Sequence, residues 1–430
     1  MSAEATQSRE AGAPLVGDLD GTLLRTDLLH ESAVTAVARA PLAALGALGP
    51  LLRGDRATVK RRLASLGPVD AATLPLREEV VALVAAERAR GRRTILATAA
   101  DELLARPVAE RLGLFDELLA SDGRRNLGGE AKRAELVARF GEKGFDYVAD
   151  RRADLPVFRS ARRAVLVGPA VRLRAEVERA GTEVAGEVPD RRQSLGTLVS
   201  ALRLRQWVKN LLVFVPVVTG HVFTPEALAS AAVSFLALGL LASGVYLLND
   251  LGDLAADRAH PGKRRRPLAS GALSIGAAVA LVPFLLAASA LLTAALPAGA
   301  RVLLALYLAT TTLYTLFLKR KVLVDVFALA FLYTVRVLLG GAAAAVPVSP
   351  WLLAFSVFLF LSLAFAKRAA ELLALEGRGG AVAAGRGWTV RDAPMVRVLG
   401  AASGYLAGLV LAIYVQGDVT RRLYAHPGWL

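Results

Sequence analysis

The feature that most constrains this chain is a series of apolar runs in its C-terminal half, each long enough to approach the thickness of a lipid bilayer. A helix needs roughly 20 mainly apolar residues to cross the hydrocarbon core. We identify seven such runs, at residues 208–224, 227–248, 273–296, 299–318, 322–345, 350–366 and 397–416. Because backbone polar groups in lipid must be satisfied within the protein, we expect an all-α polytopic membrane bundle there.

The charged loops between these runs predict their orientation. Lysine and arginine collect in alternate loops, around residues 203–209, 258–266, 319–321 and 367–391, whereas the loops at 219–227, 297–301 and 346–350 carry almost none. By the positive-inside rule the basic loops face the cytosol, together with the N-terminal part. The first dozen residues are polar and lack the apolar core of a signal peptide. We therefore expect a multi-pass protein of the inner (cytoplasmic) membrane.

The charge and the cysteine content exclude several classes of function. The net charge is +15, but the basic residues cluster at the ends of the apolar runs, where they meet anionic membrane lipids, so we expect no nucleic-acid partner. The absence of cysteine excludes disulfides, thiolate catalysis and cysteine-ligated metals. The histidines are too scattered to predict a metal cluster; they are His30, His221, His260 and His426. Nothing in the pattern indicates an oligomeric state.

The N-terminal part, up to about Gly196, alternates strand-like and helix-like segments. We expect strands at 14–18, 93–98, 116–120, 145–149 and 164–168, and helices at 101–112, 130–140 and 153–160. Such alternation predicts an α/β Rossmann-like domain with a parallel sheet covered by helices on both faces. Ligands of these sheets bind at the carboxyl ends of the strands. Asp18, Asp20, Thr98 and Asp150 follow strand ends, so we expect them to converge.

These residues resemble the four motifs of the haloacid-dehalogenase (HAD) phosphatase family, over about residues 14–170. The corresponding positions are Asp18-x-Asp20-Gly-Thr22, Thr98, Lys132 and Asp150-x-x-x-Asp154. One departure is Ala149, which replaces the glycine usual before the fourth motif. The helical segment 27–75, inserted after the first motif, is similar to a small cap.

The resemblance implies a role for each matching side chain. Asp18 would be the nucleophile that forms an aspartyl-phosphate, and Asp20 the general acid and base. Thr98 and Lys132 would hold the phosphoryl oxygens. Asp18 and Asp150 would bind Mg²⁺. The alternative is a HAD fold retained as a scaffold without turnover.

A second group of candidate functional residues, rich in aspartate, lies at the end of the second apolar run. The segment reads Asn249-Asp250-x-x-Asp253-x-x-x-Asp257. On one helix, carboxylates spaced three and four apart form a single stripe, and a divalent cation such as Mg²⁺ would neutralise their repulsion. The dense basic segment 258–267 follows directly, and its Lys263, Arg265 and Arg266 suit phosphate oxygens. Carboxylates, a metal and cations beside a membrane predict diphosphate chemistry on a lipid.

From about Ser194 to the end, the chain resembles the UbiA superfamily of intramembrane prenyltransferases. The resemblance rests on Gln206-Trp-Val-Lys209-Asn210, on the aspartate segment and on the HPxKRxRPxASG loop after it. Together with Lys367-Arg368-x-x-Glu371, these segments are most similar to the decaprenyl-phosphate phosphoribosyltransferases of that superfamily. Aromatic prenyltransferases usually carry a second aspartate-rich motif, where this chain offers only Asp325.

The resemblance implies a transferase site in the membrane domain. Asp250 and Asp253 would be catalytic and, with Asp257, would bind the metal. Phosphate oxygens would be bound by Lys209, Asn249, Lys263, Arg265, Arg266, Arg336 and Lys367. Arg336 lies inside the fifth apolar run, where a charge costs at least ~2.5–3.5 kcal/mol, so we expect it to face a polar cavity or to pair with a carbonyl or Asp325.

Two reactions fit these residues. In the first, 5-phosphoribosyl-1-diphosphate donates a phosphoribosyl group to a polyprenyl phosphate, and the HAD-like domain then removes the 5-phosphate. In the second, a prenyl diphosphate donates its prenyl group to an aromatic or other acceptor, and the HAD-like domain is regulatory or a scaffold. The fusion favours the first, because only that product carries a phosphomonoester. A plain membrane tether would not need Asp250, Asp253, Asp257 or Arg336.

The expected domain boundaries follow from the changes in composition. We expect a disordered N-terminus at 1–13, the HAD-like domain at 14–180, a linker at 181–197 and the UbiA-like domain at 198–430. Seven spans would leave the C-terminus outside, whereas the superfamily usually has nine. Residues 421–430 resemble the start of a further helix, so either the chain is truncated or its bundle closes differently.

Overall fold

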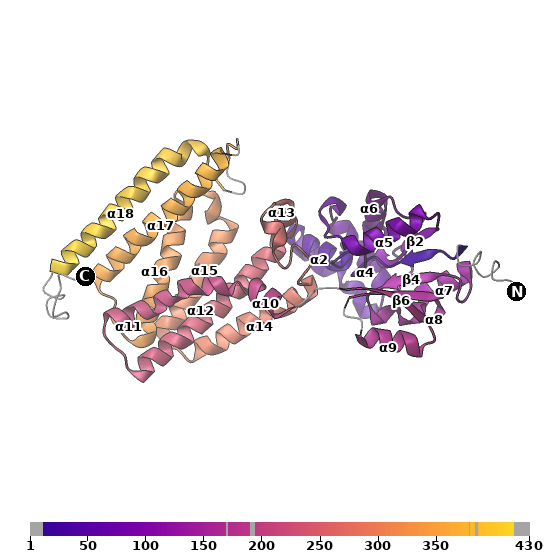
Figure 1. Cartoon of the computed structure of the whole chain (residues 1–430). Helices are drawn as coiled ribbons and strands as arrows, with labels where there is room; N and C mark the ends of the chain where they lie inside the picture. Colours follow the sequence, from indigo (N-terminus) through magenta and orange to yellow (C-terminus); the bar gives the residue numbers. More distant parts are fainter. Residues whose placement is uncertain (1–11, 169–170, 190–193, 378, 383–385, 417–430) are drawn as a thin grey trace. The chain divides into compact units, whose positions relative to one another are not determined.

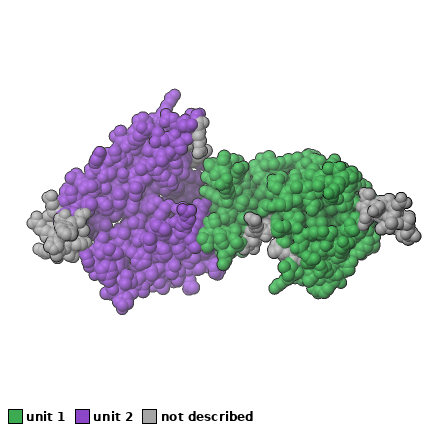
Figure 2. Space-filling model, in the orientation of Figure 1, with its two compact units in different colours: residues 1–201, 247–281 green, residues 202–246, 282–430 purple. Residues whose placement is uncertain are grey.

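The structure is a computed structural model that describes residues 12–168, 171–189, 194–377, 379–382 and 386–416. The chain forms two compact units (Figure 2). Unit 1 comprises Met1–Ala201 together with Leu247–Leu281, and unit 2 comprises Leu202–Tyr246 together with Val282–Leu430. The aspartate segment and its basic loop therefore belong to the same unit as the N-terminal domain.

The centre of unit 1 is a six-stranded parallel sheet of order β3-β2-β1-β4-β5-β6. Its strands are β1 (Leu15–Gly17), β2 (Thr94–Asp101), β3 (Glu117–Ser121), β4 (Asp146–Ala149), β5 (Arg163–Val167) and β6 (Glu183–Val188). In the register, Leu15 of β1 pairs with Thr94 on one side and Asp146 on the other. The predicted α/β class is confirmed. Strand β6 is a correction, because it occupies residues that we expected to be a linker.

Alternation along the strands builds a core on each face of the sheet. Leu15 and Val148 belong to one buried cluster, whereas their neighbours Val16 and Tyr147 belong to the other, because successive strand side chains point to opposite faces. The first cluster packs under α5 (Glu78–Ala89) and α6 (Glu102–Leu112). The second packs under α7 (Glu130–Phe140), α8 (Leu155–Ser160) and α9 (Val171–Arg179). Helices thus cover both faces (Figure 1).

The segment between β1 and α5 is helical, as predicted for a cap. Its helices are α2 (Leu28–Arg39), α3 (Pro41–Ala47), η1 (Gly49–Arg53), α4 (Arg56–Leu66) and η2 (Ala71–Thr73). Asp27 caps α2 by accepting from the amides of Leu29 and His30, which satisfies free donors at the helix start. A small cluster made mainly of alanine, including Ala36 and Ala44, joins these helices.

Six helices of the described residues are long and apolar enough to cross a membrane. They are α12 (Pro225–Gly252), α14 (Ile275–Ala294), α15 (Ala298–Leu316), α16 (Val324–Ala344), α17 (Pro350–Glu376) and α18 (Ala393–Gln416). The chain is an integral membrane protein. In unit 2, α16 is central, because its residues join the apolar cluster shared with α12 and α15 and also the cluster shared with α17 and α18.

The first of the seven predicted runs differs from a membrane-spanning helix. Residues 208–224 contain the end of η4 (Leu204–Phe214) and the short α11 (Val215–Thr219). Pro216, in the first turn of α11, has no amide hydrogen to donate, which favours a new helix start over a continuous helix. The predicted disordered N-terminus, up to residue 11, and the predicted C-terminal helix start at 421–430 lie outside the described residues.

Candidate functional site

The carboxyl ends of β1 and β4 hold a buried charge cluster in unit 1. Lys132, on α7, donates from Nζ to Asp18 Oδ1 at 2.8 Å, to Asp154 Oδ1 at 2.9 Å and to the Tyr147 hydroxyl at 3.0 Å. The Tyr147 hydroxyl itself donates to Asp154 at 3.0 Å. The Lys132 side chain is only 2% exposed. The resemblance placed Lys132 at the site of Asp18 but gave no role to Tyr147, although Tyr147 lies on the strand that ends just before Asp150.

The loop after β1 brings the first and fourth motifs together. The Thr22 hydroxyl donates to Asp150 Oδ1 at 3.1 Å. Gly21 has φ +80°, and a Cβ there would lie 2.2 Å from Asp150 Oδ2, so only glycine fits between the two motifs. Asp20 accepts the amide of Leu28, the first residue of α2, at 2.8 Å. This bond fixes the proposed acid–base carboxyl against the start of the inserted helices.

A cavity of about 140 Å³ opens over these carboxylates. Asp18, Asp20 and Lys132 line it, with Lys60 and Arg151, which sequence reasoning missed. Lys60 comes from α4 in the predicted cap and donates to the Ala99 carbonyl at 2.6 Å and to Asn126 at 2.7 Å. Arg151 donates to Asp27 at 3.0 Å. Arg151 could have been predicted from the sequence, because it directly follows Asp150 of the fourth motif. No feature of the sequence around Lys60 indicated that it would line the cavity.

Thr98 lies differently from the prediction. Strand β2 continues beyond it to Asp101, so Thr98 is inside the strand and fully buried. Its hydroxyl accepts the amide of Ala100 at 3.0 Å. Among the described residues that line the cavity, the second motif is represented by Ala99 and Ala100. The structure thus brings together Asp18, Asp20, Lys132 and Asp150, but it directs the Thr98 hydroxyl to its own backbone.

The electrostatics of this cavity favour a cation. The pKa of Asp18 is raised to about 7, mainly because the carboxyl group is buried. Lys132 lowers this pKa, and the negative charges of Asp154 and Asp150 raise it further. Burial likewise raises the pKa of Asp20. Lys132 remains charged, because the two facing carboxylates outweigh its burial and raise its pKa. Hard carboxylate oxygens in excess of the facing cations are the donor set that fits Mg²⁺.

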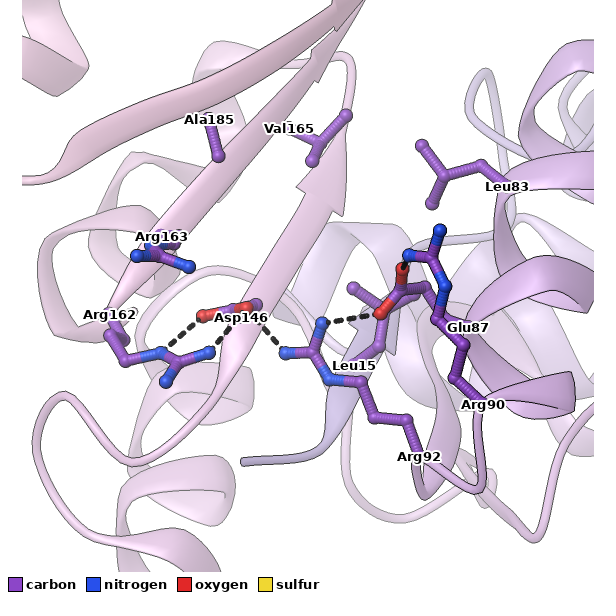
Figure 3. Close-up of a pocket in the computed structure, with 10 residues that line it drawn as sticks. All are labelled: Leu15, Leu83, Glu87, Arg90, Arg92, Asp146, Arg162, Arg163, Val165 and Ala185. Carbon is purple, nitrogen blue, oxygen red and sulfur yellow. Dashed lines mark hydrogen bonds and ion pairs between the residues drawn. The ribbon is translucent and has the colours of Figure 1, made fainter. Parts of the chain in front are cut away.

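A larger hollow, of about 470 Å³, lies at the opposite edge of the sheet, near the amino ends of β1, β4 and β5. Figure 3 shows Asp146 there between Arg92 and Arg162, both of which donate to its carboxylate. Arg92 also donates to Glu87 at 3.0 Å. These ion pairs hold the ends of the strands together. Ligands of parallel sheets bind at the carboxyl ends of the strands, which is the edge that carries Asp18, so the Asp18 cavity is the candidate site of unit 1.

The aspartate segment breaks into two helices, which corrects the predicted single stripe. Helix α12 ends at Gly252, and Asp253 stands before α13 (Leu254–Ala259) with φ −99° and ψ 12°. Asp250 and Asp257 are 6% and 1% exposed, whereas Asp253 is exposed. The break at Gly252 turns Asp253 away from the line that the spacing of three and four would give on a continuous helix.

Arg266 joins the two buried carboxylates. Its Nη1 lies 3.0 Å from Asp250 Oδ1 and 2.5 Å from Asp257 Oδ2. Lys263 Nζ lies 3.6 Å from Asp257 Oδ1, an oxygen that has no hydrogen-bond partner. Arg265 is exposed. Within the described residues no set of three histidine or acidic side chains is close enough to hold a metal ion. Asp250 and Asp257 are nevertheless two buried carboxylates, one with an oxygen that accepts no hydrogen bond, and such oxygens suit a divalent cation.

In unit 2, Arg336 is held by protein groups on several sides. Its Nε donates to Asn210 Oδ1 at 3.1 Å, its Nη2 donates to the Tyr307 hydroxyl at 3.1 Å, and its Nη1 donates to the Leu332 carbonyl. The guanidinium also lies 5.2 Å from the centre of the Tyr333 ring. Lys209 also contacts Tyr333, with its Nζ 5.8 Å from the centre of the same ring. Arg336 therefore bonds a backbone carbonyl, which was one of the partners that we expected for it. The other expected partner, Asp325, forms its ion pair with Arg368.

Asp325 instead pairs with Arg368. Both side chains are fully buried, and Arg368 Nη2 lies 2.6 Å from Asp325 Oδ2. Arg386 Nη1 lies 3.4 Å from the same oxygen, and Glu371 contacts both arginines. Lys367, which we predicted to bind substrate, is exposed. The sequence showed the Lys367-Arg368 pair but not which of the two faces inward.

Comparisons with known proteins agree with this architecture. The UbiA prenyltransferase family matches residues 212–415, and the haloacid dehalogenase-like hydrolases match residues 15–159. The uncharacterized protein y4nM of Sinorhizobium fredii is 36% identical over 420 residues, which cover 97% of this chain and 81% of that relative. The chain belongs to the UbiA prenyltransferase family.

Other relatives of this UbiA-family enzyme match part of the chain. The decaprenyl-phosphate phosphoribosyltransferase of Mycolicibacterium smegmatis is 36% identical over 187 residues, which cover 42% of this chain and 59% of that relative. A UbiA homolog from Archaeoglobus fulgidus, solved bound to DMAPP and Mg²⁺, is 21% identical with a TM-score of 0.42, covering 50% of this chain and 78% of that one. The N-terminal HAD-like region and the UbiA region are therefore fused in one chain.

Proposed function

We propose that this UbiA-family enzyme transfers a phosphoribosyl group from 5-phosphoribosyl-1-diphosphate to a polyprenyl phosphate, and that its HAD-like domain then removes the 5-phosphate. The observation that carries the proposal is the pair of sites in one chain: a basic loop on buried aspartates, and a phosphatase-like carboxylate cluster. Similarity to the decaprenyl-phosphate phosphoribosyltransferases supports the first step. We place the enzyme in the inner membrane with the HAD-like domain in the cytosol.

The first step breaks the bond between the ribose C1 and the diphosphate oxygen, and an oxygen of the lipid phosphate forms the new bond to C1. Negative charge grows on the departing diphosphate. Lys263 and Arg266, which lie beside Asp257 and Asp250, would stabilise this charge together with the exposed Arg265 of the same loop. Arg266 contacts both carboxylates, and it would exchange these contacts for phosphate oxygens when the diphosphate binds. A bound Mg²⁺, held by Asp250 and Asp257 with Asp253, would supply further charge neutralisation.

The second step is hydrolysis of the phosphomonoester at Asp18. The Asp18 carboxylate attacks phosphorus, and the ribose oxygen leaves with a proton from Asp20. Water then cleaves the aspartyl-phosphate, with Asp20 taking the proton, so that inorganic phosphate is released. Lys132 positions Asp18 and offers a cation to the phosphoryl oxygens. A Mg²⁺ held by Asp18 and Asp150 would complete the charge balance.

The test is incubation of the purified full chain with phosphoribosyl diphosphate radiolabelled in the ribose, together with polyprenyl phosphate and Mg²⁺. We expect label in the lipid phase. Label confined to the aqueous phase, with prenyl transfer from a prenyl diphosphate to an aromatic acceptor instead, would reject phosphoribosyl transfer. An Asp250→Ala variant is the matched control, since it should lose label transfer while keeping the soluble domain intact.

A further inference from the structure

The cap segment of unit 1 carries an unusual surface made of leucine. Helices α3 and η1 together form a short apolar segment, Pro41–Arg53. Its exposed leucines, which we call the leucine face, are Leu42 at 83%, Leu45 at 65%, Leu48 at 40%, Leu51 at 48% and Leu52 at 94%. A run of adjoining exposed apolar side chains is uncommon on water-facing surfaces and marks an interaction site.

The leucine face inverts the usual arrangement of an amphipathic helix. The side of α3 that packs on the cap is formed by alanines, Ala44 and Ala47, which are 2% and 3% exposed. The larger leucines point away from this core. A helix normally buries its larger apolar residues against its own domain. In α3 the larger leucines are exposed instead, so they are available to contact a partner outside the domain.

The charges around the leucine face indicate what that partner is. Residues 32–54 contain no aspartate or glutamate. Arg39, Arg53 and Arg56 flank the face and are exposed. An apolar face bordered by arginines is the pattern of segments that lie in the interface of a bilayer, with the apolar side chains below the headgroups and the cations beside anionic lipids.

Contacts within unit 1 tie this segment to the loop between two membrane helices. Glu31, in the first turn of α2, forms an ion pair with Arg258, which lies between α12 and α14. Gly271 in the same loop, with φ +74°, approaches Arg25 so closely that a Cβ would lie 2.6 Å from the Arg25 carbonyl. Helix α2 has 12 residues, about 18 Å, and leads directly into α3. One short helix therefore joins the leucine face to the part of unit 1 that contacts this loop.

We propose that the leucine face docks on the bilayer in which the chain is embedded, with its leucines among the lipid acyl chains and its arginines at anionic headgroups. Docking would hold the cap, and with it Lys60 of the Asp18 cavity, at the membrane surface. The proposal does not depend on which diphosphate substrate the membrane site uses.

The test uses the absence of cysteine from the chain. Full-length Leu52→Cys is labelled with a polarity-sensitive fluorophore and reconstituted in vesicles of phosphatidylglycerol and phosphatidylcholine, with and without a doxyl-labelled quencher lipid. Val171→Cys is the matched control, because Val171 is an apolar side chain that is 85% exposed at the start of α9, a helix that packs on the second core cluster and not in the cap. Leu45→Cys is a second labelling site, and circular dichroism verifies the folding of each variant.

We expect blue-shifted emission and several-fold stronger lipid quenching at position 52 than at position 171, and weaker quenching in vesicles of phosphatidylcholine alone. Equal, weak quenching at both positions would overturn the proposal. A second result would also overturn it: no quenching by the lipid at position 52, together with self-quenching of the label that disappears when unlabelled protein is added. The leucine face would then be an interface between copies of the chain. Quenching that ignores lipid charge would overturn the role of the arginines.

Discussion

At the scale of single residues, the proposed transferase site is built around one guanidinium, that of Arg266. Arg266 contacts both Asp250 and Asp257 through Nη1, while Lys263 stands 3.6 Å from Asp257 as a point charge. Guanidinium and ammonium groups differ in geometry, because the planar guanidinium offers two parallel donors to a phosphate and the ammonium does not. Arg266 and Lys263 therefore have different tasks in the same loop.

We predict that Arg266→Lys will raise the KM for the diphosphate donor about tenfold, because one bidentate contact is lost while the charge remains. Steady-state kinetics of the full chain over a range of donor concentrations measures this effect. Arg264→Lys, in the exposed part of the same loop, is the control and should change the KM little. A KM that Arg266→Lys leaves unchanged would make Arg266 a headgroup anchor.

We predict that Asp250→Ala and Asp257→Ala will abolish metal-dependent transfer, because each removes one of the two buried carboxylates that Arg266 contacts and, with it, a proposed metal ligand. Asp253→Ala should do the same if this exposed carboxylate turns to the metal when substrate binds. Transfer assays with all three variants measure the loss. Near wild-type transfer by all three would reject the metal site.

At the scale of secondary-structure elements, the buried pair Arg258–Glu31 connects α13 to α2. The contact is bidentate, at 2.5 and 3.0 Å, and both side chains are 4% exposed. The Thr26 hydroxyl donates to Glu31 at 2.5 Å, and Arg258 also donates from Nε to the Ala269 carbonyl at 3.1 Å. Arg258 directly follows Asp257, so the pair fixes the helix that carries this proposed metal ligand.

We predict that Glu31→Gln will lower the free energy of unfolding of unit 1 by about 3 kcal/mol, because removing one partner leaves a buried charge uncompensated. Thermal unfolding of the detergent-solubilised full chain, followed by circular dichroism, measures the loss. The double variant Glu31→Arg with Arg258→Glu should recover part of the stability. Glu79→Gln, at an exposed ion pair with Arg25, is the control and should cost less than about 1 kcal/mol.

At the scale of the whole molecule, the proposed function assigns two reactions to two separate sites, and mutation can test them one at a time. Asp18 and Asp250 lie at different sites of one polypeptide, one at the carboxyl end of β1 and the other in the last turn of a membrane helix. A reaction in two steps should therefore stop at its intermediate when only the second site is disabled.

We predict that Asp18→Asn will leave phosphoribosyl transfer intact and block the later dephosphorylation, because it removes the nucleophile but keeps the shape of the side chain. The variant should accumulate a lipid product one phosphate group heavier than that of the wild type. Mass spectrometry of the extracted lipid measures the difference. Identical product masses would instead favour a HAD-like domain that serves as a scaffold.

We predict that a chelator will abolish both activities and that Mg²⁺ will restore them, because each site gathers buried carboxylates that a divalent cation neutralises. Transfer of ribose label and hydrolysis of p-nitrophenyl phosphate are measured on the same preparation. Zinc and calcium are the comparison ions. Full transfer in the presence of the chelator would contradict a metal requirement at the membrane site.

The sequence by itself determined the architecture of both halves. Bilayer thickness imposes a minimum length on apolar runs, and six of the seven predicted runs coincide with membrane-length helices. Strand and helix alternation predicted the parallel sheet, because a buried parallel strand needs apolar residues on both faces. The resemblance to the HAD motifs also implied that Lys132 lies at the site of Asp18, and the two side chains are in contact.

Only the tertiary structure decided which side chains face one another. The helix break at Gly252 separated Asp253 from Asp250 and Asp257, the extension of β2 buried Thr98, and packing turned Arg368 rather than Lys367 toward Asp325. The partners Glu31 and Arg258 stand 227 positions apart in the chain. Local periodicity specifies the faces of an element, whereas a pairing between distant elements depends on how those elements pack, which no local pattern records.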